Sequence, residues 1–295
     1  MTDNKINVAI VGPGNIGTDL MYKISHRSKY MNLSMMCGIY EDSTGLKLAK
    51  QFGVDTSANG INDLLSRNDI DMVFDATTAA AHQNHAQLFK ESGIFAVDLT
   101  PAAVGPYCIP VVNLQEHIES DIKNLNLITC GGQATIPIVK AVSRVTPVNY
   151  AEIVAVIASK SAGPGTRQSI DEFTQTTAKG IIELGGADYG KAIILLNPAT
   201  PPMIMNNTIY MRIKEWDEIS ITDSVEKMVS DVQSYVPGYR LKIPPTFDGN
   251  RVVVMVEVEG SGDFLPTYSG NLDIETCAAL AIGERKAKYL LNCQP

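Results

Sequence analysis

Cys130 is the residue whose surroundings most favour covalent chemistry. It lies in the string LITCGGQATIP, where a strand-like run ends at the cysteine and two glycines follow. We expect a helix to start near Thr135, with Pro137 in its first turn. A thiol beside a helix N-terminus has a favoured thiolate, and backbone N–H groups near Gly131 and Gly132 could stabilise an oxyanion. Cys130 is a candidate nucleophile; the alternative is a buried structural cysteine, the usual state of this residue type.

The other cysteines and the histidines lack such surroundings. Cys37 is expected in the core, and structural positions are also expected for Cys108, Cys277 and Cys293. No CxxC pair occurs, so neither a zinc site nor a disulfide framework is indicated. His82 and His85 are three residues apart on an expected helix and could share a metal, but no third ligand is visible. The string HQNH is more typical of a solvated helix face, and we predict no metal site.

A glycine-rich string near the start of the chain has the spacing of a dinucleotide site. Its GxGxxG pattern lies between an expected strand and an expected helix, and acidic residues follow the second expected strand. Such glycines permit a tight turn and let the backbone approach a pyrophosphate, which the helix N-terminus attracts. The candidate binding residues are Gly12, Pro13, Gly14, Asn15, Ile16 and Gly17.

Two further segments bear on cofactor binding. Glu41 or Asp42 could bind a ribose 2′-OH, which favours NAD, but Tyr40 ends the strand where an acid is often placed, so NADP stays open. The string SAGPGT at 161–166 reads as a loop that could contact phosphate or be simply a turn. Arg167 beside it could bind an anion or be a surface charge. A capping-box spacing, Ser169 to Glu172, opens the next expected helix.

The elements that must position these residues follow an alternating pattern in the first half of the chain. Strands are expected at 6–11, 33–40, 71–76 and 95–98, and helices at 18–28, 44–52 and 82–92. This alternation is typical of a doubly wound parallel sheet. Strands expected at 150–159, 208–213 and 251–259 indicate a second domain of α+β type. A last helix, about 274–291, could return to the first domain.

The composition fits a soluble globular protein of about two domains. The chain has 295 residues, 45% of them hydrophobic and 19% charged, and its net charge is −8. An acidic chain gains no general attraction to nucleic acid or anionic membrane, and no apolar stretch is long enough to span a membrane. With no export signal and reduced thiols expected, the cytoplasm is the predicted location.

Several longer strings resemble those of the acylating acetaldehyde dehydrogenases of bacterial meta-cleavage pathways, which degrade aromatic hydrocarbons. The resemblance covers nearly the full chain. The strings that carry it are GPGNIGTDLM at 12–21, DLTPAAVGPYCIPVVNL at 98–114, TCGGQATIP at 129–137, SKSAGPGTRQSIDEFT at 159–174, LNPATPPMIM at 196–205 and GNLDI at 270–274.

The resemblance implies a Rossmann NAD-binding domain at 1–130, completed by a C-terminal helix at about 274–295. A catalytic and dimerisation domain would occupy 131–273. The implied reaction is aldehyde + CoA + NAD giving acyl-CoA + NADH, through a thioester on a cysteine that matches Cys130. Matching NAD-binding positions are Pro13 to Ile16, together with Ser161, Ala162, Gly163, Pro164, Gly165, Thr166, Arg167, Gln168, Ser169 and Asn271. Members of this family also associate with 4-hydroxy-2-oxovalerate aldolase, which passes them acetaldehyde.

Two residues depart from the family pattern. Asn207 stands where the family usually has an aspartate that assists the cysteine or the CoA thiol, and asparagine cannot accept a proton. Tyr40 stands where the family usually has an aspartate near the adenosine ribose. Two rival functions follow. One is an acyl-phosphate reductase of the semialdehyde dehydrogenase type, and the other is an altered paralogue that serves mainly as the NAD-binding partner subunit of an aldolase.

Overall fold

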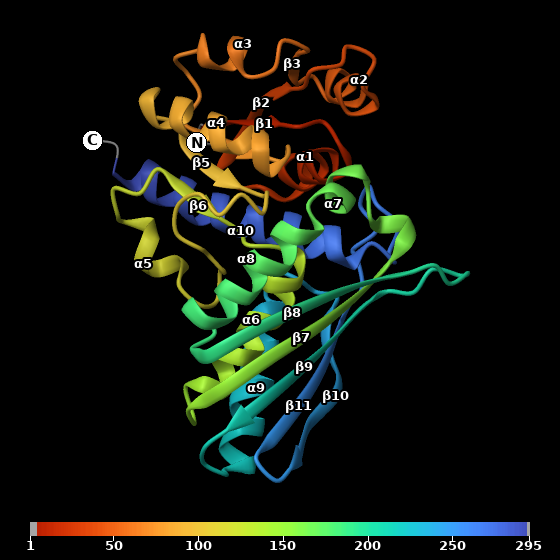
Figure 1. Ribbon diagram of the computed structural model, residues 1–295. Coiled ribbons are helices and arrows are strands. Elements are labelled where there is room, and N and C mark those ends of the chain that lie inside the picture. The colour runs from red at the N-terminus through yellow and green to blue at the C-terminus, as the bar shows by residue number, and fades with distance from the viewer. Residues whose placement is uncertain (1–4, 294–295) are drawn as a thin grey trace. The chain divides into compact units, whose positions relative to one another are not determined.

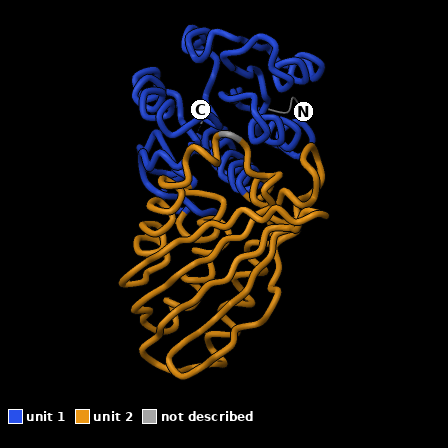
Figure 2. The backbone as a smooth tube through the Cα atoms, turned by 45° about the vertical axis from the view of Figure 1, so that its right-hand side comes forward, with its two compact units in different colours: residues 1–110, 114–127, 275–295 blue, residues 111–113, 128–274 orange. Residues whose placement is uncertain are grey.

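The computed structural model describes residues 5–293, which form two compact units (Figure 2). Unit 1 takes its residues from three stretches of the chain: the part up to residue 110, then 114–127, then the part from 275 onward. Unit 2 holds 111–113 and 128–274. Within the described residues, no helix has the length and apolar character needed to cross a membrane.

Unit 1 is built on a six-stranded sheet in which all neighbouring strands are parallel (Figure 1). The strands are β1 (Ile6–Val11), β2 (Met31–Cys37), β3 (Asp55–Ser57), β4 (Met72–Asp75), β5 (Phe95–Asp98) and β6 (Asn124–Asn126). Their order is β3-β2-β1-β4-β5-β6, which reverses direction at β1. Dinucleotide-binding sheets have this order, and they bind ligands at the reversal point, outside the carboxyl ends of the strands. The predicted doubly wound sheet is confirmed.

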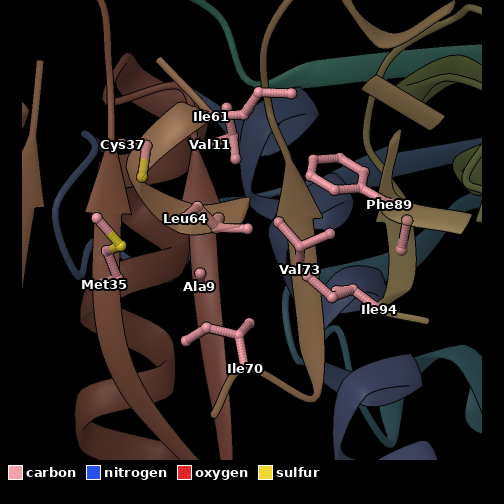
Figure 3. Packing of buried hydrophobic residues seen from close by; sticks show 11 residues of the cluster. Ala9, Val11, Met35, Cys37, Ile61, Leu64, Ile70, Val73, Phe89 and Ile94 are labelled. Atoms are coloured by element: carbon pink, nitrogen blue, oxygen red, sulfur yellow. The ribbon is translucent and has the colours of Figure 1, made fainter. Parts of the chain in front are cut away.

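The short strands of the unit 1 sheet carry apolar side chains that pack against helices. These helices are α1 (Asn15–Arg27), α2 (Thr44–Gln51), α3 (Asn62–Leu65), α4 (Ala79–Glu91) and α5 (Leu114–Ile118). Figure 3 shows one core cluster, in which Val11, Val73 and Phe89 are buried together with Cys37. Burial raises the pKa of the Cys37 thiol to about 12, with the nearby Asp63 carboxylate adding to the rise. Cys37 is therefore a core residue, as expected.

Helix α10 (Gly270–Asn292) belongs to unit 1 from residue 275 onward. The Thr276 hydroxyl lies 2.6 Å from Oδ2 of Asp19 on α1, and both residues are buried. Further along the helix, the Glu284 carboxylate accepts hydrogen bonds from two backbone N–H groups in the turn before β2. Polar bonds as well as apolar packing therefore fix this helix in the unit.

Unit 2 contains a mixed five-stranded sheet of order β10-β11-β9-β7-β8, in which only β7 and β8 are parallel neighbours. Its strands are β7 (Val148–Ala158), β8 (Ala187–Asn197), β9 (Met205–Ile213), β10 (Tyr239–Asp248) and β11 (Arg251–Val258). Its helices are α6 (Cys130–Ser143), the 3-10 turn η1 (Ser159–Ser161), α7 (Pro164–Gln168), α8 (Ile170–Glu183) and α9 (Glu218–Gln233). The expected α+β character of this part of the chain is confirmed.

One face of the unit 2 sheet is covered by helices and the other is open (Figure 1). Helix α6 packs against β7, β8, β9 and β11, while α8 packs against β8 and α9 against β10. Burial alternates along β9: Asn207 and Ile209 are buried, whereas Thr208 is partly exposed and Tyr210 exposed. Because side chains alternate across a strand, the buried set faces the helices.

Candidate active site

Cys130 is the first residue of α6. The preceding strand, β6, ends at Asn126, and the helix starts five residues before Thr135, so both expected boundaries are wrong. Pro137 consequently lies inside the helix rather than in its first turn. The cause is a cap that local pattern did not reveal. The Thr129 hydroxyl accepts a 2.9 Å hydrogen bond from the Gly132 N–H and so starts the helix at the cysteine.

The residues around Cys130 are held in place from several sides. The Thr129 hydroxyl is also 2.7 Å from the Thr177 hydroxyl on α8, and both are buried. Ile128 has φ of 67°, a left-handed conformation that is an outlier for a β-branched residue. A Cβ on Gly131 would lie 2.6 Å from Cζ of Phe173, so only glycine lets α6 and α8 approach this closely. Strained backbone of this kind clusters at functional sites, and no sequence pattern signalled it.

The position of Cys130 suits a reactive thiolate. Its side chain is partly exposed, and the first turn of α6 carries no acidic residue. The positive end of the helix dipole therefore stabilises a thiolate with no competing carboxylate in that turn. Cys108 and Cys277 are buried, and burial raises the pKa of the Cys108 thiol. Cys293 is exposed, so the expectation of a structural position for it is wrong.

Asn207 and Asn271 are two buried amides of unit 2. Each side chain is 1% exposed, and neither the amide nitrogen nor the oxygen has a hydrogen-bond partner among the described residues. Asn207 lies on the face of β9 against which α6 packs, and Asn271 lies in the first turn of α10. Buried polar groups without partners are costly, so these amides are suited to meet a polar ligand.

The turn after β1 has the geometry that a dinucleotide needs. Gly12 has φ of +100°, and a Cβ there would lie 2.5 Å from the Ala76 carbonyl oxygen. A Cβ on Gly17 would lie 2.0 Å from the Gly12 carbonyl oxygen. A Cβ on Gly14, the N-cap of α1, meets nothing within 4 Å. Gly12 and Gly17 close the turn, whereas the space over Gly14 is open for a pyrophosphate at the start of α1. This cradle fits NAD. Pro13, Asn15 and Ile16, the other predicted binding residues, lie in this turn and at the start of α1.

The segment after β2 lies beside this turn. A Cβ on Gly38 would meet the Pro13 ring at 2.6 Å. Strand β2 ends at Cys37, so the prediction that Tyr40 ends this strand is wrong. Tyr40 lies in the following loop with 73% of its surface exposed. Glu41 and Asp42 are exposed, and Asp42 accepts a 3.2 Å hydrogen bond from Lys47. An acid is therefore present near the turn, but beyond the strand end.

The 161–169 segment is more ordered than the predicted loop. Ser161 ends η1, and residues 164–168 form α7. Ser161 and Ala162 are buried. Among the remaining predicted residues, Gly165 and Gln168 are exposed, and Gly163, Thr166 and Ser169 are partly exposed. The Arg167 guanidinium donates to the Ala162 and Ser159 carbonyls at 3.1 and 2.9 Å, so it fixes this segment and is not a free surface charge. Ser169 is shared between α7 and α8, and its side chain makes no capping bond, so the predicted capping box is wrong.

The histidine pair is not on a solvated face. His82 is fully buried and His85 largely so, and both Nδ1 atoms lie within 2.9 Å of Oδ2 of Asp75. Among residues 5–293 no group of three or more His, Cys, Asp or Glu side chains could hold a metal. The prediction of a solvated face failed because the buried partner of both histidines, Asp75, is the last residue of strand β4 and is not visible in the local pattern HQNH.

The fold and the site residues define a class: a dehydrogenase with a dinucleotide-binding sheet in unit 1 and a cysteine at a helix N-terminus in unit 2. Residues 7–121 match the family model for the semialdehyde dehydrogenase NAD-binding domain, and 130–266 match the model for the prokaryotic acetaldehyde dehydrogenase dimerisation domain. The chain belongs to the acetaldehyde dehydrogenase family.

Relatives support this membership over the full length. The chain is 67% identical to an acetaldehyde dehydrogenase of Desulfitobacterium hafniense, over 99% of this chain and 98% of the relative. It is 57% identical to one of Geobacillus stearothermophilus over 99% of both chains, and 56% identical to one of Carboxydothermus hydrogenoformans over 98% and 95%. The rival functions, an acyl-phosphate reductase and an altered partner subunit, are not favoured by these similarities.

Proposed function

We propose that the protein is a CoA-acylating aldehyde dehydrogenase that converts acetaldehyde, or a similar short aldehyde, with CoA and NAD to acyl-CoA and NADH. The observation that carries the proposal is Cys130: a partly exposed thiol at the first position of a capped helix. In this proposal unit 1, with the later part of α10, is the NAD-binding domain, and unit 2 is the catalytic and dimerisation domain.

The chemistry divides into two transfers at one carbon. The Cys130 thiolate attacks the aldehyde carbonyl carbon, a C–S bond forms, and the oxygen takes a proton to give a thiohemiacetal. NAD held at the glycine turn of unit 1 would supply the acceptor for the hydride on that carbon. The oxygen then loses its proton, and a thioester remains on Cys130. The CoA thiolate attacks the thioester carbon, acyl-CoA leaves, and Cys130 is again a thiolate. The start of α6 holds negative charge near the reacting sulfur at each stage.

The test is NADH formation from acetaldehyde with and without CoA, repeated with NADP, with propanal, and with phosphate in place of CoA. CoA-dependent reduction of NAD supports the proposal. Phosphate-dependent turnover would point to the acyl-phosphate reductase. Absence of turnover, with Cys130 alkylated by iodoacetamide no faster than the other cysteines, would favour the partner-subunit function.

Asn207 is proposed to act beside Cys130 through its amide, which can hydrogen-bond but cannot take a proton. Asn207→Asp should raise kcat by about tenfold or more, since a general base commonly contributes that much or more. The carboxylate is a base only when ionised, so kcat of the variant should increase with pH in a way that kcat of the wild type does not. Steady-state rates between pH 5 and 9 measure this. An unchanged kcat and pH profile would contradict a proton-transfer function at this position.

The assembly is proposed to be a homodimer, or a higher assembly built from it, formed through the open face of the unit 2 sheet. This unit matches the dimerisation model, and its open face carries half-buried apolar side chains beside a hollow of about 600 Å³ lined in part by Tyr150, Tyr210 and Phe247. Tyr210→Asp should shift the protein toward the monomer because a charge would be buried without a partner. Sedimentation velocity measures the change. Ile219→Asp, on the helix-covered side, is the control, and equal dissociation by both variants would contradict the assignment.

Two further assignments are proposed on the resemblance. A 4-hydroxy-2-oxovalerate aldolase would be the partner that supplies acetaldehyde, which co-purification of the two proteins would test. The second is the cytoplasm as the location of the enzyme, because the proposed reaction consumes CoA and NAD, whose pools are found there.

A further inference from the structure

A buried polar cluster lies at the carboxyl edge of the unit 1 sheet. Asp75 and Asp98 are the last residues of β4 and β5, stand opposite each other in the strand register, and are fully buried. His82 lies between them: its Nδ1 is 2.9 Å from Oδ2 of Asp75 and its Nε2 is 3.3 Å from Oδ2 of Asp98. One imidazole thus spans two adjacent strand ends.

Each aspartate shapes the segment that follows its strand. The Asp75 carboxylate accepts hydrogen bonds from the backbone N–H and the hydroxyl of Thr77. The Asp98 carboxylate accepts from the Thr100 N–H at 2.8 Å and from the Asn126 amide at 2.6 Å. These segments leave the sheet on the edge where dinucleotide-binding sheets hold their ligands.

The first of these segments is in contact with the glycine turn. The Ala76 N–H donates to the Val11 carbonyl at 2.8 Å, and the Ala76 carbonyl oxygen is what a Cβ on Gly12 would strike. Any shift of Asp75 is therefore passed to Ala76 and from there to Gly12.

The surroundings of His82 favour a positive charge at the centre of the cluster. Burial favours the neutral imidazole, but the hydrogen bond to Asp75 and the charges of both aspartates outweigh it and raise the pKa of His82. Burial opposes the Asp75 charge, but bonds from His82 and His85 bring the pKa of Asp75 down to about 2. Burial raises the pKa of Asp98 to about 6, and burial with the nearby Asp98 raises that of Glu275 on α10, which favours a neutral acid there.

We infer that His82 is a positioning residue for NAD: it bridges Asp75 and Asp98, holds the ends of β4 and β5 together, and so fixes the Ala76–Gly12 contact that shapes the cofactor turn. This inference rests on the proposed function only in naming NAD as the ligand. Without this imidazole no described residue would stand between the two buried carboxylates, since His85 contacts only Asp75 of the two, and the segments they organise would separate.

The test measures NAD binding directly, by calorimetry on the full chain without aldehyde or CoA. His82→Gln should raise the Kd for NAD about tenfold or more and raise its KM, with kcat at saturating NAD changed little. The double variant His82→Gln with Asp98→Asn removes one of the opposed carboxylates and should recover most of the affinity. His85→Gln is the matched control, because His85 binds the same Asp75 oxygen from a less buried position; its Kd should stay within about twofold.

Two results would overturn the inference. One is a Kd for NAD in folded His82→Gln equal to that of the wild type. The other is a lower melting temperature in the single variant that the double variant restores, while the Kd for NAD of the double variant stays equal to that of the single variant. The alkylation rate of Cys130 by iodoacetamide, measured without NAD, should be unaffected and reports on unit 2. A wild-type chain that binds NAD but does not oxidise acetaldehyde would overturn the proposed function and leave this inference standing.

Discussion

Cys130→Ser is expected to abolish formation of the acyl-enzyme and to lower turnover by about a thousandfold or more, because a hydroxyl at this position lacks the thiolate on which the reaction depends. Serine is nearly isosteric, and the side chain it replaces is only partly buried, so the melting temperature should change little. Mass spectrometry after incubation with NAD and acetaldehyde, without CoA, should show one acetyl group on the wild type and none on the variant.

Cys293→Ser is the matched control for this experiment. It makes the same atomic change at an exposed thiol near the end of α10, and it should leave both acylation and turnover unaltered. Normal turnover in Cys130→Ser would remove the central residue from the proposed mechanism. Loss of activity in both variants would indicate a general sensitivity to sulfur replacement.

Gly14→Val is expected to raise the Kd for NAD about tenfold or more, a loss of at least ~1.4 kcal/mol, with almost no effect on folding. Gly14 has φ of −78° and ψ of −166°, a conformation open to any residue, and nothing lies within 4 Å of its Cβ position. The valine side chain would therefore fit the protein but fill the space through which the pyrophosphate approaches. Calorimetry with NAD and thermal unfolding of the same sample measure the two quantities.

Gly12→Ala provides the contrast. Its φ of +100° and the Ala76 carbonyl at 2.5 Å both oppose a side chain, so affinity and thermal stability should fall together. Gly14→Val should therefore lower only the affinity for NAD, whereas Gly12→Ala should also deform the turn and lower the thermal stability. NAD affinity in Gly14→Val equal to that of the wild type would contradict the placement of the pyrophosphate.

The fold was largely accessible from sequence because its signals are local and periodic. The apolar string of β1 and the glycines after it predict a strand, a turn and a helix in succession. The alternation that follows repeats this unit. The strands expected at 150–159, 208–213 and 251–259 were enough to indicate a second sheet, separate from the parallel sheet of unit 1.

The details of the site were less accessible because they depend on residues distant in sequence. The true start of α6 rests on Thr129, which also contacts Thr177 of another helix, and the left-handed Ile128 has no sequence signature. Periodicity placed His82 on a helix but not its buried side, because Asp75 and Asp98 meet it only when parallel strands align. The orphaned amide of Asn207 likewise depends on which face of β9 the helices cover.

The late part of α10 has a consequence for synthesis. The ribosome makes residues up to 127 first, then the rest of unit 2, and only then the segment from 275 onward that supplies Thr276 to Asp19. While the chain emerges, unit 2 has its entire sequence available before unit 1 does. The first unit to begin is thus completed after unit 2, and until the segment from 275 onward is made unit 1 lacks the residues that pair with Asp19, a state in which exposed apolar surface is open to chaperones.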